Sequence, residues 1–224
     1  MRKKPKNNHQ SYHYDLDPHS LAIIGQARDA MQTGRSLETP PPLPTVTILT
    51  SKPFFTSTFS APTPSEAIMI IARFEAMPKT EEKIVIIKDY DKPTLGFPFG
   101  GVEIGESDSG IIDKDKPQAC RREILEEIFG VPENEFSENK AQELGIVITE
   151  SDFIGKIQKA PDHTVYVYAP ILPASCRPKL KHGKEQQAVL VVSASMIDQY
   201  IEEGIFLDTH AKGWEMFKQR FYYK

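Results

Sequence analysis

The stretch Arg122-Glu-Ile-Leu-Glu-Glu-Ile-Phe-Gly130 has the composition of a helix that ends at a glycine. At about 100° per residue, Glu123, Glu126 and Glu127 fall on one stripe of that helix, beside an apolar face. Three carboxylates on one exposed stripe would repel one another. A hard divalent cation such as Mg²⁺ would turn that repulsion into ligation, whereas the alternative interpretation is an ordinary solvated charged face.

The preceding loop favours the metal-binding interpretation. Pro98-Phe-Gly-Gly-Val-Glu-Ile-Gly-Glu106 places a proline and three glycines immediately before a glutamate. Together, loop and helix resemble the signature of the Nudix hydrolase family, Gly-x5-Glu-x7-Arg-Glu-U-x-Glu-Glu-x-Gly-U, in which U is aliphatic. Gly100 matches its first glycine, Glu106 its first glutamate, and the resemblance spans residues 100–131.

Three departures interrupt this resemblance. Residues 107–121 separate Glu106 from the arginine, fifteen where the signature has seven, and we assign the surplus to a polar excursion at 107–115. Deletion of the eight surplus residues, 108–115, is expected to leave a folded, metal-binding protein with altered KM or substrate preference. Phe99 replaces a glycine that usually precedes the signature. Two residues, Ile128 and Phe129, precede Gly130 where the signature has one, which predicts a shifted helix end that leaves the glutamates unaffected.

The resemblance implies a chemistry. Nudix enzymes hydrolyse a nucleoside diphosphate linked to some other group, using Mg²⁺ or Mn²⁺, because a metal neutralises the phosphate oxygens and lowers the pKa of water. The resemblance also implies that three helix glutamates and one backbone carbonyl bind the metal. The ligands expected on this basis are Glu123, Glu126, Glu127 and the Phe99 carbonyl, with Gly100 structural, Arg122 in the catalytic set, and Glu106 bracing the loop or Arg122.

Further site residues lie outside the signature. The general base varies within the family, and Glu185, just before an expected strand, is the best distant candidate, with an ordinary loop residue as the alternative. Arg73 and Lys88, near strand ends, are candidates for phosphate contacts and equally for surface charges. Tyr166 is a candidate for stacking on a base.

The order of expected elements predicts an α/β fold. By resemblance it is the α/β/α sandwich of the Nudix family, with a mixed β-sheet. Strands are expected at residues 45–49, 67–74, 83–88, 153–157, 164–172 and 188–192, and helices at 117–129, 194–203 and 209–221.

The sequence predicts an N-terminal extension at residues 1–44, which precedes an expected Nudix domain at residues 45–224. Asp17-Pro18 predicts a helix start, and Leu21, Ile24, Ala27 and Met31 form its apolar stripe. A proline-rich linker follows at 39–44. The stripe needs an apolar partner, either the domain's own sheet or a second subunit, and oligomers in the family favour a homodimer.

Composition limits the function. The chain has 224 residues, a formal net charge of −4 and only two cysteines, Cys120 and Cys176. Net acidity argues against nucleic-acid binding, and two cysteines fit a reducing, cytoplasmic compartment. No apolar run approaches the roughly 20 residues that span a bilayer, so we expect a soluble protein with no membrane partner.

Three classes of function follow. The first is a hydrolase acting on a small nucleoside diphosphate derivative, such as a nucleotide sugar, an ADP-ribose-like compound or a damaged nucleoside triphosphate. The second is a catalytically inactive Nudix-fold module that binds a nucleotide or regulates; loss of a signature glutamate would favour it, and all three are present. The third, a helix used only for partner contacts, predicts no metal dependence.

Overall fold

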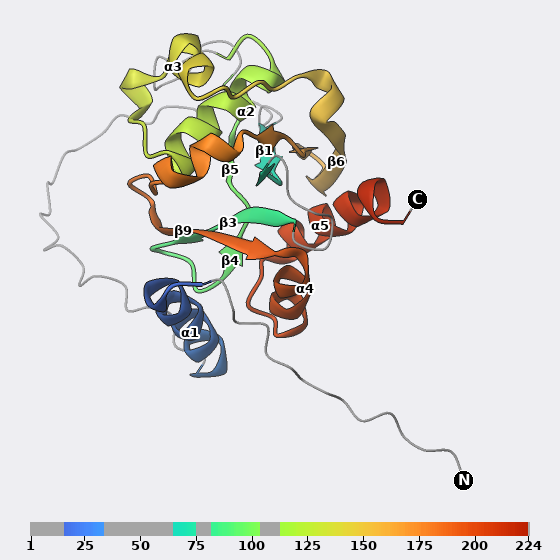
Figure 1. The fold of residues 1–224 in the computed structure, drawn as a ribbon. Helices are drawn as coiled ribbons and strands as arrows, with labels where there is room; N and C mark the ends of the chain where they lie inside the picture. Colours follow the sequence, from blue (N-terminus) through green and yellow to red (C-terminus); the bar gives the residue numbers. More distant parts are fainter. Residues whose placement is uncertain (1–15, 34–64, 75–81, 104–112, 224) are drawn as a thin grey trace, which may run out of the picture.

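The computed structural model describes residues 16–33, 65–74, 82–103 and 113–223, which form an α/β protein (Figure 1). The expected strand at 45–49 and Glu106 lie outside the described residues. No helix in the described ranges is long and apolar enough to span a membrane.

The strands are β1 (Ser65–Ile70), β2 (Arg73–Phe74), β3 (Lys83–Asp89), β4 (Leu95–Gly96), β5 (Phe99–Gly101), β6 (Phe153–Ala160), β7 (His163–Tyr168), β8 (Ile171–Leu172) and β9 (Gln186–Ser193). The helices are α1 (Pro18–Thr33), α2 (Lys116–Glu123), the π-helical turn η2 (Ile124–Ile128), α3 (Glu138–Glu143), α4 (Ala194–Glu202) and α5 (Asp208–Phe221), with short 3₁₀ turns at Glu133–Glu135, Glu150–Asp152 and Ala174–Lys179.

The strands form two mixed sheets. One has the order β5-β1-β7-β6, with β1 and β7 parallel; the other has the order β4-β3-β2-β8, with β9 added along β3 and β2 parallel to β8. The expected strand at 67–74 leaves one sheet after Ile70 and enters the other at Arg73, and the strand at 164–172 divides in the same way around Pro170. The two segments pass from one sheet to the other side by side, because the Ile71 amide donates to the Tyr168 carbonyl and the Arg73 amide donates to the Pro170 carbonyl.

Helices cover both sides of the sheets, which confirms the sandwich (Figure 1). The alternation of side chains along β1 divides its residues between two cores. Ala67 and Met69 pack with α1, α4 and α5, while Ile68 and Ile70 pack with α2, η2 and α3.

Helix α1 packs against the core of its own chain. Asp17 caps it by accepting from the amides of His19 and Ser20, as expected. Ile23, Ile24 and Ala27 are buried in the core that β3, β9 and α4 share. The expected stripe was partly wrong, because Leu21 and Met31 are 38% and 45% exposed. Of the two partners considered for this helix, the structure shows the chain's own sheet.

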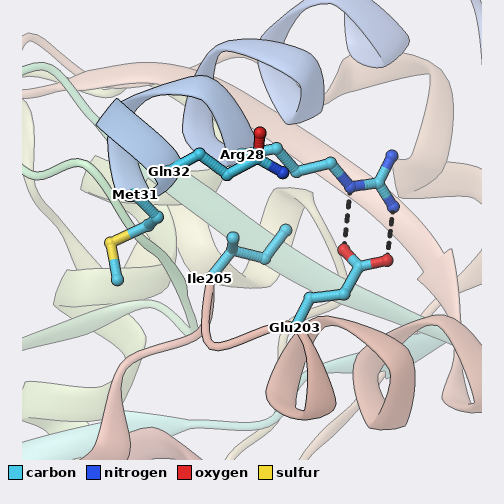
Figure 2. A pocket seen from close by; sticks show the side chains of 5 residues that line it. All are labelled: Arg28, Met31, Gln32, Glu203 and Ile205. Carbon is cyan, nitrogen blue, oxygen red and sulfur yellow. Dashed lines mark hydrogen bonds and ion pairs between the residues drawn. The ribbon is translucent and has the colours of Figure 1, made fainter. Parts of the chain in front are cut away.

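A bidentate ion pair ties the exposed side of α1 to the chain beyond α4. Arg28 Nε and Nη2 donate to the two carboxylate oxygens of Glu203, at 2.8 and 2.9 Å (Figure 2). Met31, Gln32 and Ile205 complete a shallow pocket around the pair. The contact adds a polar clamp to the apolar packing of the helix.

Candidate active site

The last residue of the polar excursion starts the helix that carries the glutamates. Asp115 has extended backbone geometry, and its side chain accepts from the Gln118 amide at 2.7 Å. Pro117 lies in the first turn, where a missing amide hydrogen has no consequence. Asp115 is therefore the N-cap of α2, and the helix begins one residue before its predicted start at 117.

The helix widens before it ends. Residues Ile124–Ile128 form a π-helical turn, Gly130 has a φ of 61°, and the Val131 amide closes the end by donating to the Leu125 carbonyl at 2.9 Å. A π-turn accommodates one extra residue within a helix. The surplus residue before Gly130 is absorbed in this way, so the expectation that it leaves the glutamates unaffected is wrong: Glu126 and Glu127 lie inside the widened turn.

Strand β5 presents its backbone polar groups to this helix. Its antiparallel register pairs Phe99 with Met69, and this pairing turns the amide and carbonyl of Phe99 away from β1. The Phe99 amide donates to Glu127 Oε2 at 2.7 Å. Gly100 faces the Glu123 carboxyl so closely that a Cβ at this position would lie 1.9 Å from the Glu123 Cδ. A side chain at position 100 would therefore displace the Glu123 carboxyl from the place where Arg122 holds it.

Arg122 is braced by an aspartate of the excursion. Its Nε and Nη2 donate to the two Asp113 carboxylate oxygens at 3.3 and 3.0 Å, and its Nη1 donates to Glu123 at 2.7 Å. Asp113 is itself held by the residue two positions after β5, because its amide donates to the Glu103 carbonyl and its carboxylate accepts from the Glu103 amide. Asp113 thus braces Arg122, whereas Glu106, for which such a role was expected, lies outside the described residues. The contacts of Asp113 and Asp115 argue against a harmless deletion of residues 108–115, because one braces Arg122 and the other caps α2.

Burial sets the electrostatics of the glutamates. Desolvation raises the pKa of Glu123 to about 7, although the neighbouring Arg122 charge opposes the shift. Desolvation raises the pKa of Glu127 well above its ordinary value, and the charge of Glu123 adds to it. In the described part of the chain, both groups that donate to Glu127 are neutral: the Phe99 amide and Gln186 Nε2, the latter at 2.9 Å. Within these residues no three His, Cys, Asp or Glu side chains converge as a metal site.

A pocket of about 570 Å³ adjoins the widened turn. The loop before β9 closes onto the helix end, because the Lys181 amide donates to the Ile128 carbonyl at 2.9 Å and Gly183 packs against the Glu126 carbonyl. Tertiary structure thus brings the distant Glu185 to the same pocket as Glu126. The pocket is lined by Glu126, Gly130, Pro132, Lys181, His182, Gly183, Lys184 and Glu185.

Two candidate phosphate contacts have other partners. Arg73 pairs with Glu82 at 2.9 Å, and its guanidinium lies 4.1 Å from the centre of the Phe221 ring. Lys88 is buried, and its ammonium donates to the backbone carbonyls of Asp89 and Lys92. The structure brings neither side chain to the pocket beside Glu126.

Tyr166 lies on β7, beside the start of α2. Its hydroxyl donates to Glu66 at 2.7 Å, and the Lys116 ammonium lies 4.2 Å from its ring centre. The ring is half-buried and already covered by a cation. Tyr166 is not among the residues that line the pocket beside Glu126.

Sequence reasoning missed Asp113 and Gln186. Eight residues separate Asp113 from Arg122, whereas the signature has seven between its first glutamate and its arginine. This similar spacing of an acidic residue is the one sequence signal for Asp113. Gln186 has no comparable signal, because it reaches the site only through the packing of β9 against the helix.

Comparisons with known proteins find similarity to solved structures only. No family model matches the chain, and no curated protein matches it. The chain is similar to the NUDIX domain of Shewanella oneidensis NrtR, solved with ADP ribose, at 10% identity and a TM-score of 0.48, over 75% of this chain and 93% of that one. It is similar to a Nitrosomonas europaea NUDIX hydrolase at 15% identity and a TM-score of 0.45, over 70% of this chain and 90% of that one. It is also similar to a C. elegans Ap4A hydrolase at 14% identity and a TM-score of 0.42, over 70% of this chain and 96% of that one.

Proposed function

We propose that the protein is a metal-dependent Nudix-type hydrolase that cleaves the diphosphate linkage of a nucleoside diphosphate joined to another group. One observation carries the proposal: a single helix buries two carboxylates, Glu123 against Gly100 and Glu127 against the Phe99 amide. Glu123 and Asp113 share the single charge of Arg122, and the donors to Glu127 among the described residues are neutral, so these buried carboxylates lack full charge compensation, which is unfavourable. Such an arrangement is expected where a cation binds.

The donor set suits Mg²⁺ or Mn²⁺. Both prefer carboxylate and carbonyl oxygens, and the Gly100 cradle, which a Cβ would fill, allows the Glu123 carboxyl to approach the backbone. Glu123, Glu126, Glu127 and the Phe99 carbonyl would hold the metal. When bound, the metal neutralises phosphate oxygens and lowers the pKa of water. Arg122, held by Asp113, fixes the Glu123 side chain.

The pocket beside Glu126 is the proposed substrate site. Its volume of about 570 Å³ lies within the usual range for small-ligand pockets. Lys181 and Lys184 place positive charge on its wall, suited to phosphate oxygens. Glu185, on the same wall, would accept the proton of the attacking water. We further propose that the protein acts in the cytoplasm, as a homodimer.

A nucleotide-binding module of the same fold is the alternative. It is favoured by the lack, among the described residues, of three converged metal-ligating side chains. Both functions require nucleotide binding, and only the hydrolase would cleave the bound nucleotide.

A substrate panel separates them. ADP-ribose, nucleotide sugars and nucleoside triphosphates would each be incubated with Mg²⁺ or Mn²⁺ and the released phosphate products measured. We expect turnover of at least one compound, lost in Glu126→Gln and retained in Glu202→Gln, an exposed carboxylate on α4. Binding by calorimetry without any turnover would favour the module.

A further inference from the structure

Gln186 occupies an unusual position at the start of β9. Its side chain is only 3% exposed, and it precedes Ala188, Leu190 and Val192, which pack in the core beneath α1, α4 and α5. A regular strand has a side-chain period of two and would turn Gln186 toward the same core. Its carboxamide instead reaches Glu127, on the helix that packs in the opposite core.

A β-bulge explains the change of direction. The pairing of β3 with β9 shifts between Lys88 and Asp89, so that Gln186 faces Asp89 while Ala188 faces Lys88. Gln187 is the extra residue, and its side chain donates to Gln26 of α1. Bulges re-aim a side chain and are frequent next to active sites. This bulge directs Gln186 to Glu127.

The contact orients Glu127 without neutralising it. Glu127 Oε1 accepts from Gln186 Nε2 at 2.9 Å, and its Oε2 accepts from the Phe99 amide at 2.7 Å. Both donors are uncharged, so they fix the plane of the carboxylate and leave its negative charge for a cation. The remaining polar atom of the amide, Gln186 Oε1, is buried without a hydrogen-bond partner among the described residues. Packing alone would favour an apolar residue here, and the donation to Glu127 accounts for the amide.

We infer that Gln186 is a positioning residue that holds the Glu127 carboxylate in the orientation in which it ligates the divalent metal. This inference rests on the proposed function. Residues that orient metal ligands typically change metal affinity by about 10- to 100-fold when they are replaced.

The test measures Mn²⁺ binding to the full chain by calorimetry, without nucleotide. Gln186→Met keeps the length of the side chain and removes its donor, and we expect Mn²⁺ affinity to fall by about 10-fold or more. Gln187→Met is the matched control, because it removes the neighbouring amide on the other side of the bulge, and it should bind Mn²⁺ like the wild type. Thermal unfolding without metal shows whether each variant is folded.

The outcomes are distinguishable. Wild-type protein that binds no Mn²⁺ overturns the proposed function and this inference with it, whereas wild-type affinity in a folded Gln186→Met overturns the inference alone. If Gln186→Met does not fold, Gln186→Lys keeps a donor but adds a positive charge beside Glu127. We then expect weakened Mn²⁺ binding, and wild-type affinity in Gln186→Lys would overturn the role of a neutral donor.

Discussion

Arg122 and Asp113 face each other in a buried, two-pronged ion pair, with side-chain exposures of 5% and 0%. The pair joins the polar excursion to the glutamate-bearing helix. Because the same guanidinium donates to Glu123, the position of a proposed metal ligand depends on a residue contributed by the inserted segment.

Asp113→Asn should therefore destabilise the protein. The change removes one of the two carboxylates that compensate the buried Arg122 charge, and we expect the free energy of unfolding to fall by about 3 kcal/mol. Urea denaturation measures this change. The control is Glu138→Gln, which breaks the more exposed pair of Glu138 with Arg121 and should cost less than about 1 kcal/mol. Equal effects of the two variants would show that the buried pair is not structural.

The two neighbouring glutamates should separate activity from stability. Glu127→Gln keeps an acceptor for the Phe99 amide, and a flipped Gln186 amide can accept from the new side chain. Since the buried carboxylate is also removed, the melting temperature without metal should be unchanged or higher. Activity and Mn²⁺ binding should fall about 100-fold or more in Glu127→Gln and in Glu126→Gln. A large drop in melting temperature with normal metal dependence would make these residues structural instead.

Glu185→Gln tests the proposed general base. Loss of a base that accepts the proton of water lowers kcat by about 10²- to 10⁴-fold, with a smaller change in KM. Steady-state kinetics on a substrate identified by the panel measures both constants. Glu202→Gln serves again as the matched control. An unchanged kcat would remove Glu185 from the mechanism.

His210 should make stability depend on pH. Burial, with smaller contributions from the Lys92 and Lys159 charges, lowers the pKa of His210 to about 3, and its Nδ1 accepts from the Phe97 amide at 2.8 Å. Between pH 6.5 and 3 the unfolded chain binds a proton here that the folded chain does not. The stability that His210 contributes is therefore lost as the pH falls, by up to about 1.4 kcal/mol per pH unit.

The variant His210→Asn isolates this contribution, because it keeps an acceptor near the Nδ1 position and cannot ionise. Glu123, whose pKa is raised to about 7, acts with the opposite sign, since its contribution falls as pH rises from 4.5 to 7. The measurement is thus the difference between wild type and variant in urea denaturation at several pH values. That difference should shrink as the pH falls below 6.5, and a constant difference would contradict the assignment.

Helix α1 should contribute to the stability of the domain. Ile24→Ala removes a side chain that is 2% exposed in the shared core and should cost about 2 to 4 kcal/mol. Leu21→Ala, at a position that is 38% exposed, should cost less than about 1 kcal/mol. Light scattering on both variants shows whether either change alters the oligomeric state. The reverse ranking in urea denaturation would place Leu21 in an interface.

The local sequence determined the features that short-range chemistry controls. The spacing of apolar residues and the capping residues predicted α1, α4, α5 and the glutamate-bearing helix to within about two residues, because backbone geometry and capping act over a few positions. The glycine at position 100 and the three glutamates were visible for the same reason. A one-residue surplus before Gly130 was also visible, but not its effect, since whether a helix ends or widens depends on what packs against it.

Tertiary structure alone decided which distant groups meet these glutamates. Asp113 braces Arg122, and it is held in turn by hydrogen bonds to the backbone of Glu103. Gln186 reaches Glu127 only because a bulge in β9 reverses its direction, and Glu185 reaches the pocket only because its loop bonds the helix end. Burial then raises the pKa values of Glu123 and Glu127. These contacts join segments up to about 60 residues apart in the chain, so no local pattern encodes them, and they form only when the sheets and helices pack together.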